Sequence, residues 1–291
     1  MMDAESLAFD AKLELFDVNH GACALLTMPS PSGVKRIMMD CGHSTAKDAV
    51  KWSPGRYLQS IGVSHLDVLF MTNYDEEHAS GYVDLLEHKI ALGCIFGNPT
   101  VPPEAIAQLK TSDGMGRGIA TLAASMAERK KLGHAENFPV VPGLGIGWCC
   151  NSYPEFTDEN NLSLVVALDI LGVKFLFTGD MERAGFSRLL QTYEPFKTLV
   201  KEVDNLVIAH HGRGSNVCTE LFEQHGCHPT VVIISDDYRQ YVSQQVTNYY
   251  VDKTKGLGDF RGKGPRSVLT TRKDGVITFT FHLSDQSCLI S

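Results

Sequence analysis

The stretch MTNYDEEHASG, residues 71–81, decides how this sequence is interpreted. It follows the apolar run HLDVLF (65–70), which is typical of a strand buried on both faces. Alternate residues of an extended chain point the same way, so Asn73, Asp75 and Glu77 share a face. His78 can approach that face from the following turn. Taken alone, the stretch fits a solvated acidic loop as well as it fits a set of metal ligands.

Further polar residues follow apolar segments in the same manner. Asp180 follows KFLFTG, His210 and His211 follow NLVIA, and Asp40 follows RIMM with His43 close behind. A divalent ion needs several carboxylate or imidazole ligands from different parts of the chain, and loops at one edge of a sheet bring such ligands together. The recurrence therefore favours a metal site over a solvated loop.

Strand-like segments dominate both halves of the chain, with helical segments between them. Residues 23–28 and 34–42 predict two strands of a hairpin with its turn at 29–33. Residues 267–281 predict a second hairpin, with its turn at Lys-Asp-Gly. The pattern predicts two sheets packed face to face with helices outside.

Two helical regions are expected in the first half. Residues 46–62 predict a helix in part of their length, broken near Pro54. Residues 102–132 predict two helical pieces that are separated by a glycine-rich segment.

Composition limits the choice of compartment and partner. The 291 residues carry a net charge of −8, which speaks against a broad basic surface for nucleic acid or a membrane. A bound divalent ion would nevertheless offset two carboxylates, so a nuclease stays open. No apolar run reaches the roughly 20 residues of a membrane helix, and the N-terminus does not resemble a secretory signal. Eight cysteines without a CxxC pair then predict reduced thiols in the cytoplasm.

Together the motifs resemble those of the metallo-β-lactamase superfamily. TNYDEEHASG (72–81) is similar to its HxHxDH motif, and FTGD (177–180) and HHG (210–212) are similar to its later metal motifs. The subgroup with the most similar motifs is the hydrolase domain of membrane DNA-uptake competence proteins and its soluble relatives. The resemblance implies one four-layer αββα sandwich of the metallo-β-lactamase type over residues 1–291, with a mainly helical insertion around 102–135.

The resemblance implies roles for the matched residues. Asp180 falls on the position that bridges two metals, and the histidine that precedes Gly212 is favoured over its neighbour as a ligand. The implied metal ligands are Asn73, Asp75, Glu77, His78, Asp180, His210 and His211. The implied catalytic residues among them are Asp75, Glu77, His78 and Asp180.

Other residues are expected around this set. Arg213 and Ser215 are placed to hold a phosphate or carboxylate oxygen of the substrate, although Arg213 fits an ordinary surface arginine equally well. Asn161, or its neighbour Asn160, lies in the region where other members place a third His, and Asn161 is expected to contact the substrate. Asp40, His43 and His20 are expected to orient the ligands from behind.

The sequence also departs from the resemblance. Asn73 replaces the first His with a neutral amide, and Glu77 is one methylene longer than the usual Asp. The set is richer in oxygen than a di-zinc site, so it favours Mn²⁺ or Mg²⁺ with Zn²⁺ still open, as one or two ions.

Three functions remain open. The resemblance favours a metal-dependent phosphodiesterase or nuclease that acts on DNA through a metal-activated water, in an assembly or after activation by a protein partner. A lactone, ester or phosphocholine-type hydrolase is the second, because one fold hosts many substrates. The third is a non-catalytic binding module, for which Asn73 is the main argument.

Overall fold

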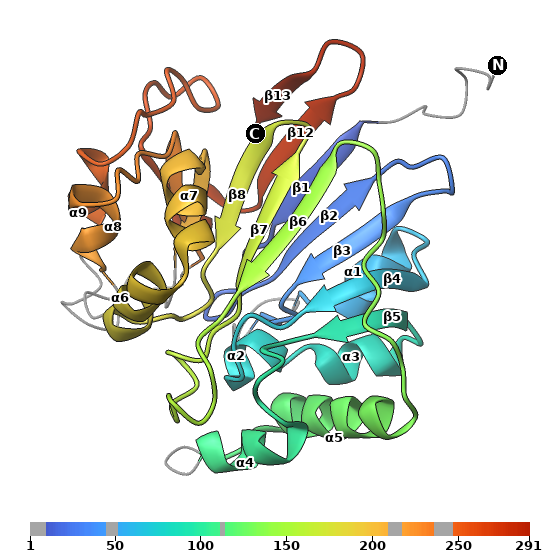
Figure 1. The fold of residues 1–291 in the computed structure, drawn as a ribbon. Helices are drawn as coiled ribbons and strands as arrows, with labels where there is room; N and C mark the ends of the chain where they lie inside the picture. Colours follow the sequence, from blue (N-terminus) through green and yellow to red (C-terminus); the bar gives the residue numbers. More distant parts are fainter. Residues whose placement is uncertain (1–9, 45–51, 111–113, 209–216, 236–246) are drawn as a thin grey trace.

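The computed structural model describes residues 10–44, 52–110, 114–208, 217–235 and 247–291. Two sheets lie face to face with helices on their outer sides (Figure 1). The first sheet has the strand order β13-β12-β1-β2-β3-β4-β5 and the second has the order β11-β10-β9-β8-β7-β6. The expected four-layer αββα sandwich is confirmed.

The strands of the first sheet are β1 (Ala11–Leu15), β2 (Ala24–Met28), β3 (Lys35–Met39), β4 (His65–Phe70), β5 (Ala91–Phe96), β12 (Ile277–His282) and β13 (Ser287–Ile290). The strands of the second sheet are β6 (Leu144–Cys149), β7 (Val165–Ile170), β8 (Val173–Phe177), β9 (Asn205–Ile208), β10 (Val231–Ile234) and β11 (Val268–Thr270).

Helices in the first half of the chain are α1 (Pro54–Ser60), α2 (Glu76–Ala79), α3 (Tyr82–Glu87), the short 3-10 helix η2 (Pro103–Ala105), α4 (Ile106–Leu109) and α5 (Arg117–Lys131). Those in the second half are α6 (Arg183–Thr192), α7 (Glu194–Glu202), α8 (Thr219–Glu223), α9 (Thr247–Val251) and α10 (Thr271–Asp274). No helix among the described residues is long and apolar enough to cross a membrane.

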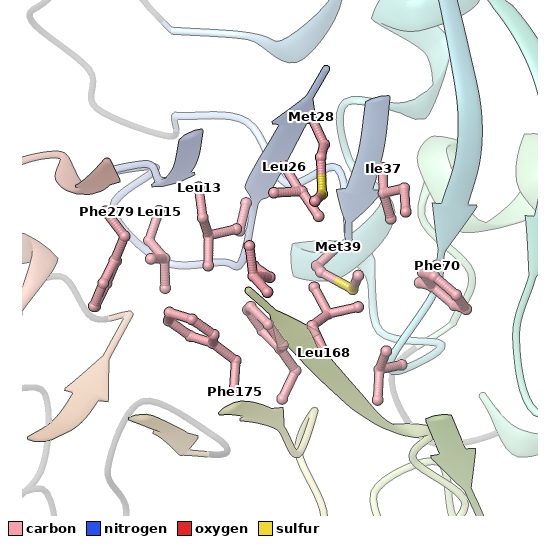
Figure 2. Close-up of a cluster of buried hydrophobic side chains, with 14 of the residues drawn as sticks. Leu13, Leu15, Leu26, Met28, Ile37, Met39, Phe70, Leu168, Phe175 and Phe279 are labelled. Atoms are coloured by element: carbon pink, nitrogen blue, oxygen red, sulfur yellow. The ribbon is translucent and has the colours of Figure 1, made fainter. Parts of the chain in front are cut away.

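The main core lies between the two sheets. Leu13 and Leu26 of the first sheet meet Leu168 and Phe175 of the second, and the ring of Phe175 lies 4.8 Å from that of Phe279 (Figure 2). Two further apolar clusters lie on the outer faces, one under α1, α3 and α5 and one under α6 to α9. Every layer of the sandwich is therefore held by its own buried apolar contacts.

Strand β4 shows why its sequence is a continuous apolar run. Val68 and Phe70 are fully buried in the cluster between the sheets, whereas Leu66 and Leu69 are fully buried under the helices. A strand that is covered on both faces has no polar side, as expected for the middle of a parallel β3–β4–β5 group.

Strand direction brings the polar loops to one region. β3, β4 and β5 are parallel, and so are β8, β9, β10 and β11. Parallel strands end at the same edge of their sheet, so the loops after β3 and β4 lie together, and the loop after β8 meets them from the second sheet. The backbone N–H of Leu164, before β7, donates to the carbonyl of Thr72 after β4 and joins the two sheets there (2.8 Å).

One expectation about elements is wrong. The hairpin at 267–281 does not form, because β11 and β12 belong to different sheets and α10 lies between them. The Thr270 side chain accepts from the N–H of Lys273 and so caps this short helix. Pro54 begins α1, where its missing N–H costs no hydrogen bond, and residues 46–51 of the expected helix lie outside the described residues.

Candidate metal centre

Residues of the 71–81 stretch lie where β4 turns into α2. His78 is on α2, and its backbone carbonyl accepts from the N–H of Cys41 in the loop after β3 (2.8 Å). The carbonyl of Glu77 lies so close to Gly42 that a Cβ there would come within 2.5 Å of it. The loop after β3 therefore fixes the turn that carries Glu77 and His78.

His78 lies between two buried carboxylates. Its Nδ1 is 2.9 Å from Oδ2 of Asp40, and its Nε2 is 3.2 Å from Oδ1 of Asp180. Only 2% of the His78 side chain is exposed. Burial acts to lower the pKa of His78, but Asp180 and Asp40 outweigh it and hold the pKa well above its usual value.

Asp40 is itself held firmly. The backbone N–H and the hydroxyl of Thr72 donate to its two carboxylate oxygens, at 2.7 and 2.5 Å. Asp40 therefore keeps the imidazole of His78 in one orientation, with Nε2 directed at Asp180. An arrangement of this kind is common behind histidines that bind metals.

Glu77 completes a compact group. Ligand atoms of Glu77, His78 and Asp180 all lie within 4.8 Å of one another. Oε2 of Glu77 is also 2.6 Å from Nε2 of His20, and both side chains are partly exposed. His78 and Asp180 line a cavity of about 40 Å³ between the sheets, which is room for about one water molecule. The group is therefore buried at His78 and Asp180 and accessible to solvent at Glu77.

Comparisons with known proteins found similarities at low sequence identity. No family model matches the sequence. The chain is 21% identical over 244 residues to ComE operon protein 3 of Bacillus subtilis (strain 168). The matched region covers 79% of this chain and 29% of that protein. The chain therefore spans less than a third of that relative's length.

Solved structures were also compared with this chain. CmlA, a diiron β-hydroxylase from Streptomyces venezuelae, has a TM-score of 0.50 and 12% identity, over 94% of this chain and 54% of CmlA. The metallo-β-lactamase SMB-1 is a weaker likeness, with a TM-score of 0.36 and 12% identity over 68% of this chain and 79% of SMB-1. The architecture itself, two facing sheets with helices on their outer sides, is the four-layer αββα sandwich of the metallo-β-lactamase type.

The residues present at the centre of this metallo-β-lactamase fold fit a divalent ion. Nε2 of His78 is buried and makes no well-aligned hydrogen bond among the described residues, although Asp180 is near. Two carboxylates and one imidazole converge there from two sheets. That donor set suits Mn²⁺, Zn²⁺ or a related ion.

Other expected ligands are engaged by protein groups instead. Asp75 lies outside the compact group and pairs with the ammonium of Lys110, which is also 2.9 Å from Glu159. Asn73 donates from Nδ2 to Ser163 Oγ (3.2 Å), and its Oδ1 accepts from the N–H of Asp75 (2.8 Å).

Asn161 and His43 also lie outside the compact group. Oδ1 of Asn161 accepts from the N–H of Gly185 (2.7 Å), and its Nδ2 donates to Asp158 (3.0 Å). The backbone N–H of His43 donates to the hydroxyl of Ser80 (3.0 Å). The expected residues His210, His211, Arg213 and Ser215 lie outside the described residues.

Sequence reasoning did not find Lys110, Thr72 or Ser163. Ser163 Oγ accepts from both Asn73 and the N–H of Asp180, and so ties the loop after β4 to the loop after β8. Lys110 follows a short helix and is the only one of the three that carries a charge. Nothing in its local pattern marks it, because its partners come from distant parts of the chain.

Proposed function

We propose that this protein is a metal-dependent phosphodiesterase that cleaves DNA, with Glu77, His78 and Asp180 as ligands of the ion and His210 or His211 as a further one. The observation that carries the proposal is the convergence of these three side chains within 4.8 Å at the meeting edge of the sheets. The sequence similarity to ComE operon protein 3 and to DNA-uptake hydrolase domains supports DNA as the substrate.

The chemistry follows from the donor set. Glu77, His78 and Asp180 would hold a divalent ion, which would supply Lewis-acid activation of a water nucleophile and of a phosphoryl oxygen. Glu77 is partly exposed beside His20, so this carboxylate is placed to accept a proton and pass it toward solvent. Because Asp40 holds the imidazole of His78 in place, we propose that His78 positions the ion and does not transfer a proton. Arg213 and Ser215 are proposed to contact phosphate oxygens.

The proposal also includes a cytoplasmic location and a protein partner. All eight cysteines are unpaired, which agrees with a reducing compartment such as the cytoplasm. The net charge of −8 opposes broad DNA affinity, so we propose that a protein partner brings the substrate or activates the site.

Single-turnover cleavage tests the proposal. Labelled single- and double-stranded DNA is incubated with the protein and Mn²⁺, Mg²⁺ or Zn²⁺. We expect metal-dependent cleavage that falls at least about 100-fold in His78→Ala and Asp180→Asn. His134→Ala and Asp252→Asn replace exposed residues of the same types and are the matched controls.

The other outcomes separate the alternatives. Metal binding without DNA cleavage, together with hydrolysis of a lactone, an ester or a phosphocholine ester, would replace DNA by that substrate. A protein that gains no thermal stability from any of the three metals and cleaves nothing would be a non-catalytic module.

A further inference from the structure

Lys110 is a buried cation beside the candidate metal centre. Its side chain is 2% exposed, and its ammonium pairs with Asp75 and lies 2.9 Å from Oε1 of Glu159. Burial acts to lower the pKa of Lys110, but hydrogen bonds to the two carboxylates outweigh it and raise the pKa. The ammonium thus lies between two carboxylates and offsets the charge of Asp75, which the sequence offers as a ligand.

The neighbouring amides are committed to protein groups as well. The amide nitrogen of Asn73 faces three acceptors, which are Glu159 O, Asn160 Oδ1 and Ser163 Oγ at 3.2 to 3.4 Å. The oxygen of Asn73 accepts from Asp75, and that of Asn161 accepts from Gly185. An ion here would have to take these oxygens away from backbone N–H donors.

We propose that the protein binds one divalent ion, at Glu77, His78 and Asp180, and that the ammonium of Lys110 stands in for a second ion beside Asp75. The inference rests on the proposed metal-dependent function and sets the number of ions at one, where the sequence leaves one or two. Asn73, Asp75 and Asn161, which the superfamily resemblance places at or near ligand positions, all have protein partners here.

Electrostatics explains why the second ion is excluded. A divalent ion at Asp75 would lie close to the ammonium of Lys110, and like charges at contact distance in a partly buried site repel each other strongly. Displacing the ammonium of Lys110 from Asp75 would leave this buried cation with Glu159 as its one carboxylate partner among the described residues, which is also costly. The fixed cation thus gives the site a positive charge that does not depend on metal concentration.

Ion counting tests the inference. The protein is freed of metal with a chelator, and Mn²⁺ and Zn²⁺ are titrated in separately, with stoichiometry read by calorimetry and by native mass spectrometry. We expect one ion per chain. Two ions on the unaltered protein would overturn the inference, and so would none.

Two variants test the part played by Asp75 and Lys110. Asp75→Asn should still bind one ion, with a Kd within about threefold of the unaltered protein, because Asp75 is not a ligand; loss of the ion would overturn the inference. Lys110→Met should gain a second, weaker ion, because Asp75 and Glu159 then face each other without a cation. Lys174→Met removes a partly exposed lysine that pairs with Glu202 at 2.5 Å, and this variant should still bind one ion.

The outcomes are distinguishable from those of the cleavage experiment. One ion without DNA cleavage supports the inference and contradicts the proposed substrate. Two ions with cleavage contradict the inference and leave the proposed function intact. A Lys110→Met variant that binds one ion and keeps its circular dichroism spectrum overturns the stand-in role of Lys110. Should that variant not fold, the unaltered protein and Asp75→Asn decide.

Discussion

At the scale of single residues, the chemistry depends on how His78 is held. Asp40 lies against its Nδ1 and Asp180 against its Nε2. The sequence placed these three residues after separate apolar runs, and the resemblance suggested that they would meet. Lys110 could not be anticipated in this way, because its role comes only from tertiary contacts with Asp75 and Glu159.

The metal-free protein should lose stability as pH rises. The pKa of His78 is raised in the folded state, so protonation of His78 stabilises the fold fully below its unfolded pKa of about 6.5, and this contribution is lost as pH rises toward the raised pKa. With chelator present, the free energy of unfolding should fall between pH 6.5 and 8, by up to about 1.4 kcal/mol per pH unit.

Denaturant unfolding at several pH values measures this dependence. His78→Gln should lack this component, whereas His134→Gln, at an exposed position, should keep it. A stability that stays level or rises with pH in the unaltered, metal-free protein would contradict the account of His78.

Asp40 should matter for metal affinity although it does not reach the ion. Asp40→Asn loses the carboxylate that orients His78, so the affinity for Zn²⁺ should fall about 10- to 100-fold. Competition with a chromophoric chelator measures the change. Asp67→Asn is the control. Asp67 also accepts a hydrogen bond from a backbone N–H, that of Arg36 (2.8 Å), but it lies on β4 away from the centre. Equal losses in both variants would contradict the orienting role.

At the scale of elements, the site depends on how the loops after β3, β4 and β8 approach one another. Gly179, just before Asp180, has φ +55, and a Cβ there would lie 2.8 Å from the carbonyl of Thr72. Only glycine tolerates both the left-handed backbone and the close approach. The FTGD motif therefore needs its glycine for geometry, and its aspartate then meets His78.

Gly179→Ala should destabilise the fold and weaken metal binding together. We expect a loss of about 2–4 kcal/mol in the free energy of unfolding, as the sum of backbone strain and the displaced Thr72 loop. Gly172→Ala shares the strain (φ +88) but meets nothing within 4 Å, so it should cost less and leave metal binding unchanged. Similar losses of metal affinity in both variants would show that strain alone is responsible.

Strands and turns were predicted correctly where the local pattern of apolar and turn-forming residues is enough to determine them. The run HLDVLF gives a strand buried on both faces, and the turn at 29–33 joins antiparallel β2 and β3. The segment 267–281 was mistaken because Lys-Asp-Gly fits a hairpin turn as well as it fits the end of a short helix. Asp274 also accepts from the N–H of Thr270 (3.0 Å) and pairs with Arg266 (2.7 Å), contacts that a strand pattern does not reveal.

At the scale of the whole molecule, the four layers explain the place of the centre. Each sheet buries apolar residues on both faces, so polar ligands can gather only where strands end. The sequence predicted the layers through the recurrence of strands and the family resemblance. It could not predict which loop residues turn inward, because that depends on hydrogen bonds between loops of different sheets, such as those of Ser163.

The most direct measurement is the position of a bound ion. Crystals of the protein, grown metal-free and soaked in Mn²⁺, are measured at a wavelength where manganese scatters anomalously. The account predicts one anomalous peak within bonding distance of Glu77, His78 and Asp180, and none between Asp75 and Glu159. A peak beside Asp75, or no peak near His78 at saturating Mn²⁺, would contradict it.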